Sequence, residues 1–140
     1  MYPPEILSRF QSDHRVGSWP AGTEDVGTGM VREPQHGDVM RIQVRVDPVE
    51  EIIREARFRT FGCGWAIASA SLAAEWLEGR SLAEALRISA DQVSGALGLP
   101  AERGHCARLA EAAVRAAIAD YQDRRASAHG KVSEDHVCNH

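Results

Sequence analysis

The chain has 140 residues, 44% of them hydrophobic, with 16 Lys and Arg against 20 Asp and Glu and a formal net charge of −4. Three cysteines are too few for a disulfide framework, and no apolar stretch reaches the roughly 18 residues that a membrane span needs. The acidic balance and the lack of a basic run argue against nucleic acid as a partner. No signal-peptide pattern opens the chain, so we expect a cytoplasmic protein with reduced cysteines.

Alternating residues predict a small sheet in the first half of the chain. Residues 3–10 come first, with apolar side chains at helical spacing that predict a short helix. Residues 26–31 are expected to form one strand. Residues 40–46 alternate strictly between apolar and polar side chains, which predicts a strand with one buried face. A similar run at 56–60 follows the turn at Asp47-Pro48, so the two runs predict an antiparallel hairpin.

The periodicity becomes helical after the second alternating run. A helix is predicted from residue 64 to about residue 79. Ser81 and Ser89 each begin a capping-box pattern, in which a Ser and a Glu or Gln three residues later satisfy free N–H groups at a helix start. The helix that follows Ser89 is broken near residues 98–100 by Gly and Pro. A longer helix is predicted at 106–125.

Strands come first and helices follow, an order typical of an α+β fold. We therefore expect a small three-stranded antiparallel sheet packed against several helices, all within one domain at residues 1–125. Residues 126–140 are polar and show no apolar periodicity, so we expect them to form a disordered tail.

Two short segments place cysteines at helix starts. Cys63 lies between two glycines where a strand gives way to a helix, which leaves the thiol uncovered and favours a thiolate through the helix dipole. A buried, inert cysteine is the alternative for this position. His105 and Cys106 open the long helix, and the same dipole would favour a thiolate at Cys106. For His105 alone, an ordinary cap or surface residue is the alternative.

A third segment, His36-Gly37-Asp38, lies in the loop before the strand at 40–46. A tight turn lets its imidazole and carboxylate reach the same point, although a solvated loop pair is the alternative. Together the three segments form a candidate set of nitrogen, sulfur and oxygen ligands suited to zinc, ferrous iron or an iron–sulfur cluster. The candidate metal ligands are His36, Asp38, Cys63, His105 and Cys106.

Two other features have competing interpretations. Trp65, close to Cys63, is either a lid over the candidate site or a core residue. At the C-terminus, His136, Cys138 and His140 form a second cluster, which we interpret as an unstructured end with a free thiol rather than a metal site.

Five segments in a fixed order resemble the IscU/NifU-type iron–sulfur cluster assembly scaffold: Val26–Val31, His36–Arg41, Phe61–Gly64, His105-Cys106 and Ala116–Tyr121. The resemblance implies a platform without enzymatic activity. On it, sulfur from a cysteine desulfurase and iron form a transient 2Fe–2S cluster, which passes to apo-proteins. It also implies cluster ligation by three cysteines, assisted by an Asp and a His. Cys63 and Cys106 match the second and third cysteines, Asp38 and His105 match the assisting pair, and Cys106 is the expected persulfide acceptor.

The chain departs from the resembled family at the first ligand, where His36 stands in place of the family's cysteine before Gly-Asp. Imidazole still binds iron or zinc, but it carries no negative charge and cannot accept persulfide sulfur. By analogy with Rieske centres, His36 would raise the cluster potential. At residues 99–103 only Leu-Pro remains of the family's Leu-Pro-Pro-Val-Lys segment, which weakens the expectation of a chaperone interaction. The alternatives are a zinc-binding sulfur-acceptor module and a divergent regulatory partner of the desulfurase.

Overall fold

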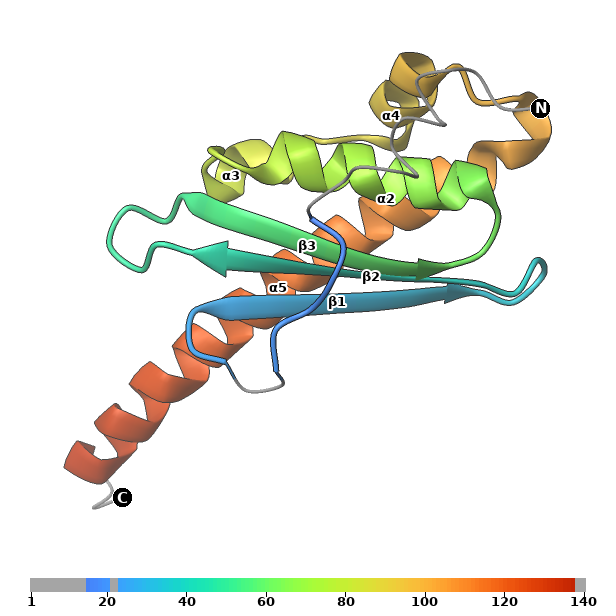
Figure 1. Cartoon of the computed structure of the whole chain (residues 1–140). Coiled ribbons are helices and arrows are strands. Elements are labelled where there is room, and N and C mark those ends of the chain that lie inside the picture. The colour runs from blue at the N-terminus through green and yellow to red at the C-terminus, as the bar shows by residue number, and fades with distance from the viewer. Residues whose placement is uncertain (1–14, 21–22, 138–140) are drawn as a thin grey trace.

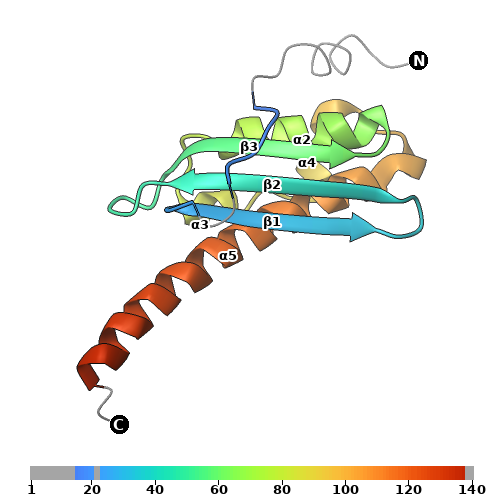
Figure 2. The ribbon, with the colours of Figure 1, turned by 60° about the horizontal axis from the view of Figure 1, so that its bottom comes forward.

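A three-stranded antiparallel sheet and a layer of helices make up the fold. The computed structural model describes residues 15–20 and 23–137, so the helix expected at 3–10 lies outside the described residues. The elements in chain order are β1 (Val26–Glu33), β2 (Asp38–Val46), β3 (Ile53–Phe61), α2 (Gly64–Leu77), α3 (Leu82–Ala85), α4 (Ala90–Leu97), the 3-10 turn η1 (Ala101–Arg103) and α5 (Gly104–Val137). The strand order is β1-β2-β3. The expected α+β fold and its three strands are confirmed, and Figures 1 and 2 show the helices on one face of the sheet.

The alternation in β2 determines which of its residues face the helices. Met40, Ile42 and Val44 are fully buried in the core, whereas Arg45 on the opposite face is exposed. Side chains two residues apart share a face of a strand, so Asp38 extends the buried row to the end of β2. Its side chain is therefore directed into the helix layer, where it is only 4% exposed.

Two glycines let α5 cross β1 at very short range. A Cβ at Gly27 would lie 2.2 Å from the carbonyl oxygen of Ala117, and one at Gly29 would lie 2.3 Å from that of Ala113. Any side chain at either position would push the helix off the sheet. This backbone contact fixes the line of α5, and therefore the place where its first residues meet the end of the sheet.

The expected helix boundaries between residues 77 and 100 are confirmed. Ser81 and Ser89 each form a complete capping box at the N-terminus of α3 and α4. Gly98 ends α4 in the left-handed conformation, with φ 64°. The short helices α3 and α4 bring the chain back from the far end of α2 to the start of α5 (Figure 1).

The long helix differs from its expected length at both ends. It begins at Gly104 and continues to Val137, through most of the segment that we expected to be disordered. Propagating an existing helix requires no new nucleus, so a helix can extend beyond the part that is packed against the sheet. Residues 138–140, which include Cys138, lie outside the described residues. Among the described residues, no helix is both long and apolar enough to cross a membrane.

Candidate metal centre

The candidate ligands meet at one end of the sheet. The loop between β1 and β2 carries His36, and β2 begins with Asp38. Cys63 lies between β3 and α2, and His105 and Cys106 lie in the first turn of α5. Antiparallel pairing brings the start of β2 beside the end of β3, with Val39 opposite Phe61. The fold thus gathers segments that are as far as 70 residues apart in sequence, counting from His36 to Cys106.

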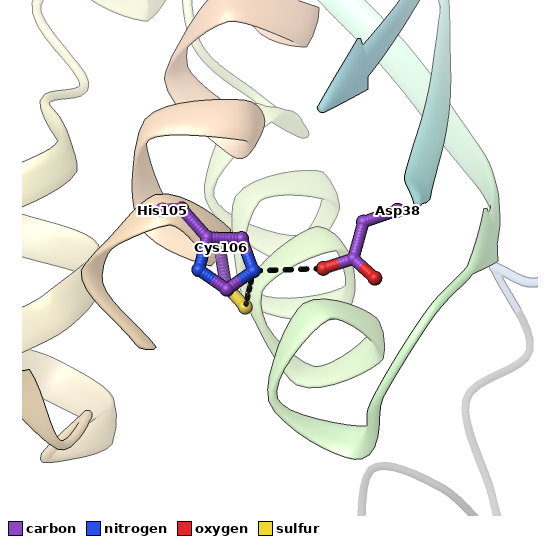
Figure 3. A group of neighbouring side chains, drawn as sticks. All are labelled: Asp38, His105 and Cys106. Carbon is purple, nitrogen blue, oxygen red and sulfur yellow. Dashed lines mark hydrogen bonds and ion pairs between the residues drawn. The ribbon is translucent and has the colours of Figure 1, made fainter. Parts of the chain in front are cut away.

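Three buried side chains form the centre of this site (Figure 3). His105 Nε2 lies 2.9 Å from Asp38 Oδ2 and 3.5 Å from Cys106 Sγ. One ligand atom from each residue lies within 4.8 Å of the others. Asp38 and His105 are 4% and 6% exposed, and Cys106 is fully buried. A nitrogen, an oxygen and a sulfur donor therefore converge in a place that excludes water.

Cys63 extends the group toward the surface. Its Sγ lies 3.9 Å from that of Cys106, and both thiols are free. Cys63 is partly exposed and occupies the N-cap position of α2, where its side chain makes no capping hydrogen bond. The two sulfur atoms are thus adjacent, one from a partly exposed cysteine and one from a buried cysteine.

Gly62 makes room for the carboxylate of Asp38. A Cβ at this position would lie 2.5 Å from Asp38 Oδ1 and 2.8 Å from its Cγ. The glycine before Cys63 is therefore required by close packing against a candidate ligand, a role that its position in the sequence does not indicate. The pairing of β2 with β3 produces this contact.

His36 joins the site through its ring. The imidazole stacks on that of His105, with centroids 3.9 Å apart and planes inclined by 4°. Glu33 contacts the edge of the same ring, with 3.1 Å between Glu33 Oε1 and His36 Nδ1. Burial opposes ionisation of Glu33, but hydrogen bonds from the His36 backbone and ring hold the pKa of Glu33 below its usual value. Sequence reasoning missed Glu33, although its position three residues before His36 can be read from the sequence.

The environment of Cys106 corrects one expectation. Burial, with smaller contributions from the neighbouring Cys63 and Asp38, raises the pKa of the Cys106 thiol to about 12. The expected thiolate at the helix start is therefore wrong for the metal-free protein, because desolvation outweighs the helix dipole. Trp65 is partly buried and packs against the hydrophobic core, which favours its interpretation as a core residue.

These features describe a small α+β module with a buried cluster of Cys, His and Asp side chains. The sequence pattern of the NifU-like N terminal domain matches residues 1–128. The chain belongs to this family.

Named relatives agree with the assignment. The chain is 46% identical over 124 residues to the iron–sulfur cluster assembly scaffold protein IscU of Escherichia coli K12, covering 89% of this chain and 96% of that protein. It is 46% identical over 123 residues to iron sulfur cluster assembly protein 1 of Trachipleistophora hominis, covering 88% of each.

A solved structure supports the fold. A putative scaffold protein for the SUF system from Fervidobacterium islandicum superposes with a TM-score of 0.64 at 18% identity, covering 84% of this chain and 96% of that one. At this identity the match concerns the fold alone.

Proposed function

We propose that this chain is an iron–sulfur cluster assembly scaffold. It binds iron and sulfide through His36, Cys63 and Cys106, with Asp38 and His105 assisting, and passes the cluster to apo-proteins. The observation that carries the proposal is the convergence of the Asp38, His105, Cys106 and Cys63 donors at one end of the sheet. Membership of the family and the names of its relatives support it.

The spacing of the donors supports metal binding without a large rearrangement. Tetrahedral coordination at metal–ligand distances of about 2.0–2.3 Å places neighbouring donor atoms about 3.3–3.8 Å apart. The separations are 3.5 Å between His105 Nε2 and Cys106 Sγ and 3.9 Å between the two sulfur atoms. The distance between His105 Nε2 and Asp38 Oδ2, 2.9 Å, is shorter because these atoms share a hydrogen bond, which would break on metal binding.

The finer part of the proposal concerns cluster type and sulfur supply. The cargo is a transient 2Fe–2S cluster, and a cytoplasmic cysteine desulfurase donates its sulfur. The Cys106 thiol gives up its proton to solvent, its sulfur attacks the outer sulfur of the donor's persulfide, the S–S bond of the persulfide breaks, and the donor cysteine leaves as a thiolate. Because Cys106 is fully buried, the first turn of α5 must move before this step.

Anaerobic reconstitution with ferrous iron and sulfide tests the proposal. The wild-type protein should develop visible charge-transfer bands and, after reduction, an EPR signal. Cys63→Ala and Cys106→Ala should abolish both, whereas Ser94→Ala on α4 should leave them unchanged. A colourless wild-type protein under conditions that load a known scaffold would contradict the proposal.

Zinc binding without cluster assembly is the second candidate. The three donor atoms that lie within 4.8 Å of one another favour it, because they suit a tetrahedral zinc site. Stoichiometric zinc in the purified protein, together with failed reconstitution, would support this candidate over the first.

A further inference from the structure

Glu33 and His36 form a compact structural unit at the edge of the site. Glu33 is the last residue of β1, and the loop folds back so that its Oε1 accepts a hydrogen bond from the His36 backbone N–H at 2.6 Å. The same oxygen lies 3.1 Å from His36 Nδ1, and the Gly37 N–H donates to the Glu33 carbonyl at 2.9 Å. Gly37 has φ +76°, the left-handed conformation that closes the turn. One carboxylate oxygen thus fixes both the backbone and the ring of His36.

The two ring nitrogens of His36 therefore have different surroundings. Among the described residues, Glu33 is the one hydrogen-bond partner of the ring, and the bond is made at Nδ1. Nε2 is left without a hydrogen bond from those residues. Because the ring lies parallel to that of His105, with centroids 3.9 Å apart, it directly adjoins one of the three side chains of the buried centre.

We propose that Glu33 is a positioning residue that presents His36 to the metal cargo through Nε2. A carboxylate that accepts from one imidazole nitrogen keeps the proton there, leaves the other nitrogen's lone pair free and makes it a better donor. Glu33 suits this task because its side chain is only 19% exposed, whereas that of His36 is 41% exposed. The inference rests on the proposed function, since it assigns the orientation of one ligand in the same site.

The Glu33–His36 pair also explains how a histidine can act as a metal ligand at a position where the resembled family has a cysteine. A cysteine thiolate needs no orientation by a neighbour, because its sulfur presents lone pairs in several directions. An imidazole binds along one nitrogen lone pair only, so the ring must be held at a defined angle. The hydrogen bond to Glu33 at the ring edge and the stack of the ring face on His105 supply that constraint.

A double-mutant cycle tests the inference with zinc as the probe. The affinity of the full chain for Zn²⁺ is measured by competition with a chromophoric chelator for wild type, Glu33→Ala, His36→Ala and the double variant. Glu33→Gln keeps an acceptor oxygen without the charge. Glu55→Ala is the matched control, because Glu55 also lies in a strand and pairs with a surface Arg45, 3.1 Å away. Circular dichroism checks that each variant is folded.

Loss of an outer-sphere partner of a ligating histidine typically weakens metal binding by about 10- to 100-fold. We expect a loss of about 10-fold for Glu33→Ala, a smaller loss for Glu33→Gln, and none for Glu55→Ala. In the His36→Ala background, Glu33→Ala should have no further effect. An equal loss in both backgrounds would show that Glu33 acts directly and would overturn the proposal. Unchanged affinity in Glu33→Ala or in His36→Ala would also overturn it.

A second measurement separates this inference from the proposed function. In the reduced, reconstituted protein, pulsed EPR should detect a ¹⁴N coupling from His36, separable by its absence in His36→Ala from any His105 coupling that remains there, and Glu33→Ala should weaken or change it. A cluster whose ¹⁴N coupling is the same in wild type and Glu33→Ala would overturn the role of Glu33 and leave the scaffold function intact. A wild-type protein that forms no cluster would end the scaffold proposal, and the zinc cycle would still decide the role of Glu33.

Discussion

The His105 ring and the Asp38 carboxylate, 67 positions apart in sequence, form a buried hydrogen bond of 2.9 Å between Nε2 and Oδ2. The bond ties the start of α5 to the start of β2. It satisfies two polar groups that are each less than 7% exposed, and it holds both near the sulfur of Cys106. The same contact therefore stabilises the fold and assembles the site.

Removal of the carboxylate should destabilise the metal-free protein. In Asp38→Ala the buried His105 ring loses its partner, and an unsatisfied buried polar group costs about 1–3 kcal/mol. We expect a fall of that size in the free energy of unfolding, measured by chemical denaturation. Asp38→Asn retains an acceptor oxygen and should lose less than half as much. An unfolding midpoint in Asp38→Ala equal to that of wild type would show that the hydrogen bond contributes nothing.

Gly62→Ala should damage the site through Asp38. The new Cβ would lie 2.5 Å from Asp38 Oδ1, so the carboxylate that is hydrogen-bonded to His105 must shift. We expect the affinity for zinc to fall by about 10-fold, the lower end of the range for loss of a partner around a metal ligand. The measurement is chelator competition.

Gly95→Ala is the control for that substitution. Gly95 lies in α4, and a Cβ there meets nothing within 4 Å. It should leave zinc affinity unchanged and raise stability by about 0.5–1 kcal/mol, because Ala favours a helix interior over Gly. Equal zinc affinity in the two variants would contradict the proposed link between Gly62 and Asp38.

Local sequence patterns were sufficient to predict much of the fold. The alternation around Met40 and Ile42 predicts β2, because a period of two needs only one buried face. Ser81 and Ser89 predict two helix starts, because a capping box is complete within four residues. The end of α5 was not predictable in this way, since its last turns carry no apolar stripe and depend on the helix before them.

Contacts between distant segments account for what the sequence could not indicate. Gly62 stands out as a glycine, but its contact with Asp38 follows from the register of β2 against β3. The candidate ligands could be named from their residue types, whereas the stacking of His36 on His105 required the fold. At Cys106 the position at a helix start was predicted correctly, but the burial that raises its pKa depends on the packed helices and sheet.

The pKa of Cys106 predicts a loss of stability in alkali. The folded-state value of about 12 lies above the ordinary value of 9.0, so the unfolded chain loses its proton first as the pH rises. The stabilisation is complete below pH 9 and declines between about 9 and 12. At pH 10 the wild-type free energy of unfolding should have fallen by about 1 kcal/mol more than that of Cys106→Ala, both relative to pH 7. If the free energies of unfolding of wild type and Cys106→Ala fall equally between pH 7 and pH 10, measured by chemical denaturation, the raised pKa of Cys106 would be refuted.

Replacement of His36 by cysteine should lower the reduction potential of the reconstituted cluster. His36→Cys exchanges a neutral donor for a thiolate, and the added negative charge stabilises the oxidised form. Rieske-type centres with two histidine ligands lie several hundred millivolts above clusters held by cysteines alone, so we expect one exchange to lower the potential by about 100 mV or more. A spectroelectrochemical titration measures the shift, with the remote Glu55→Ala as the control. An unchanged potential would mean that His36 does not bind the cluster. The stack on His105 would then be a packing contact only.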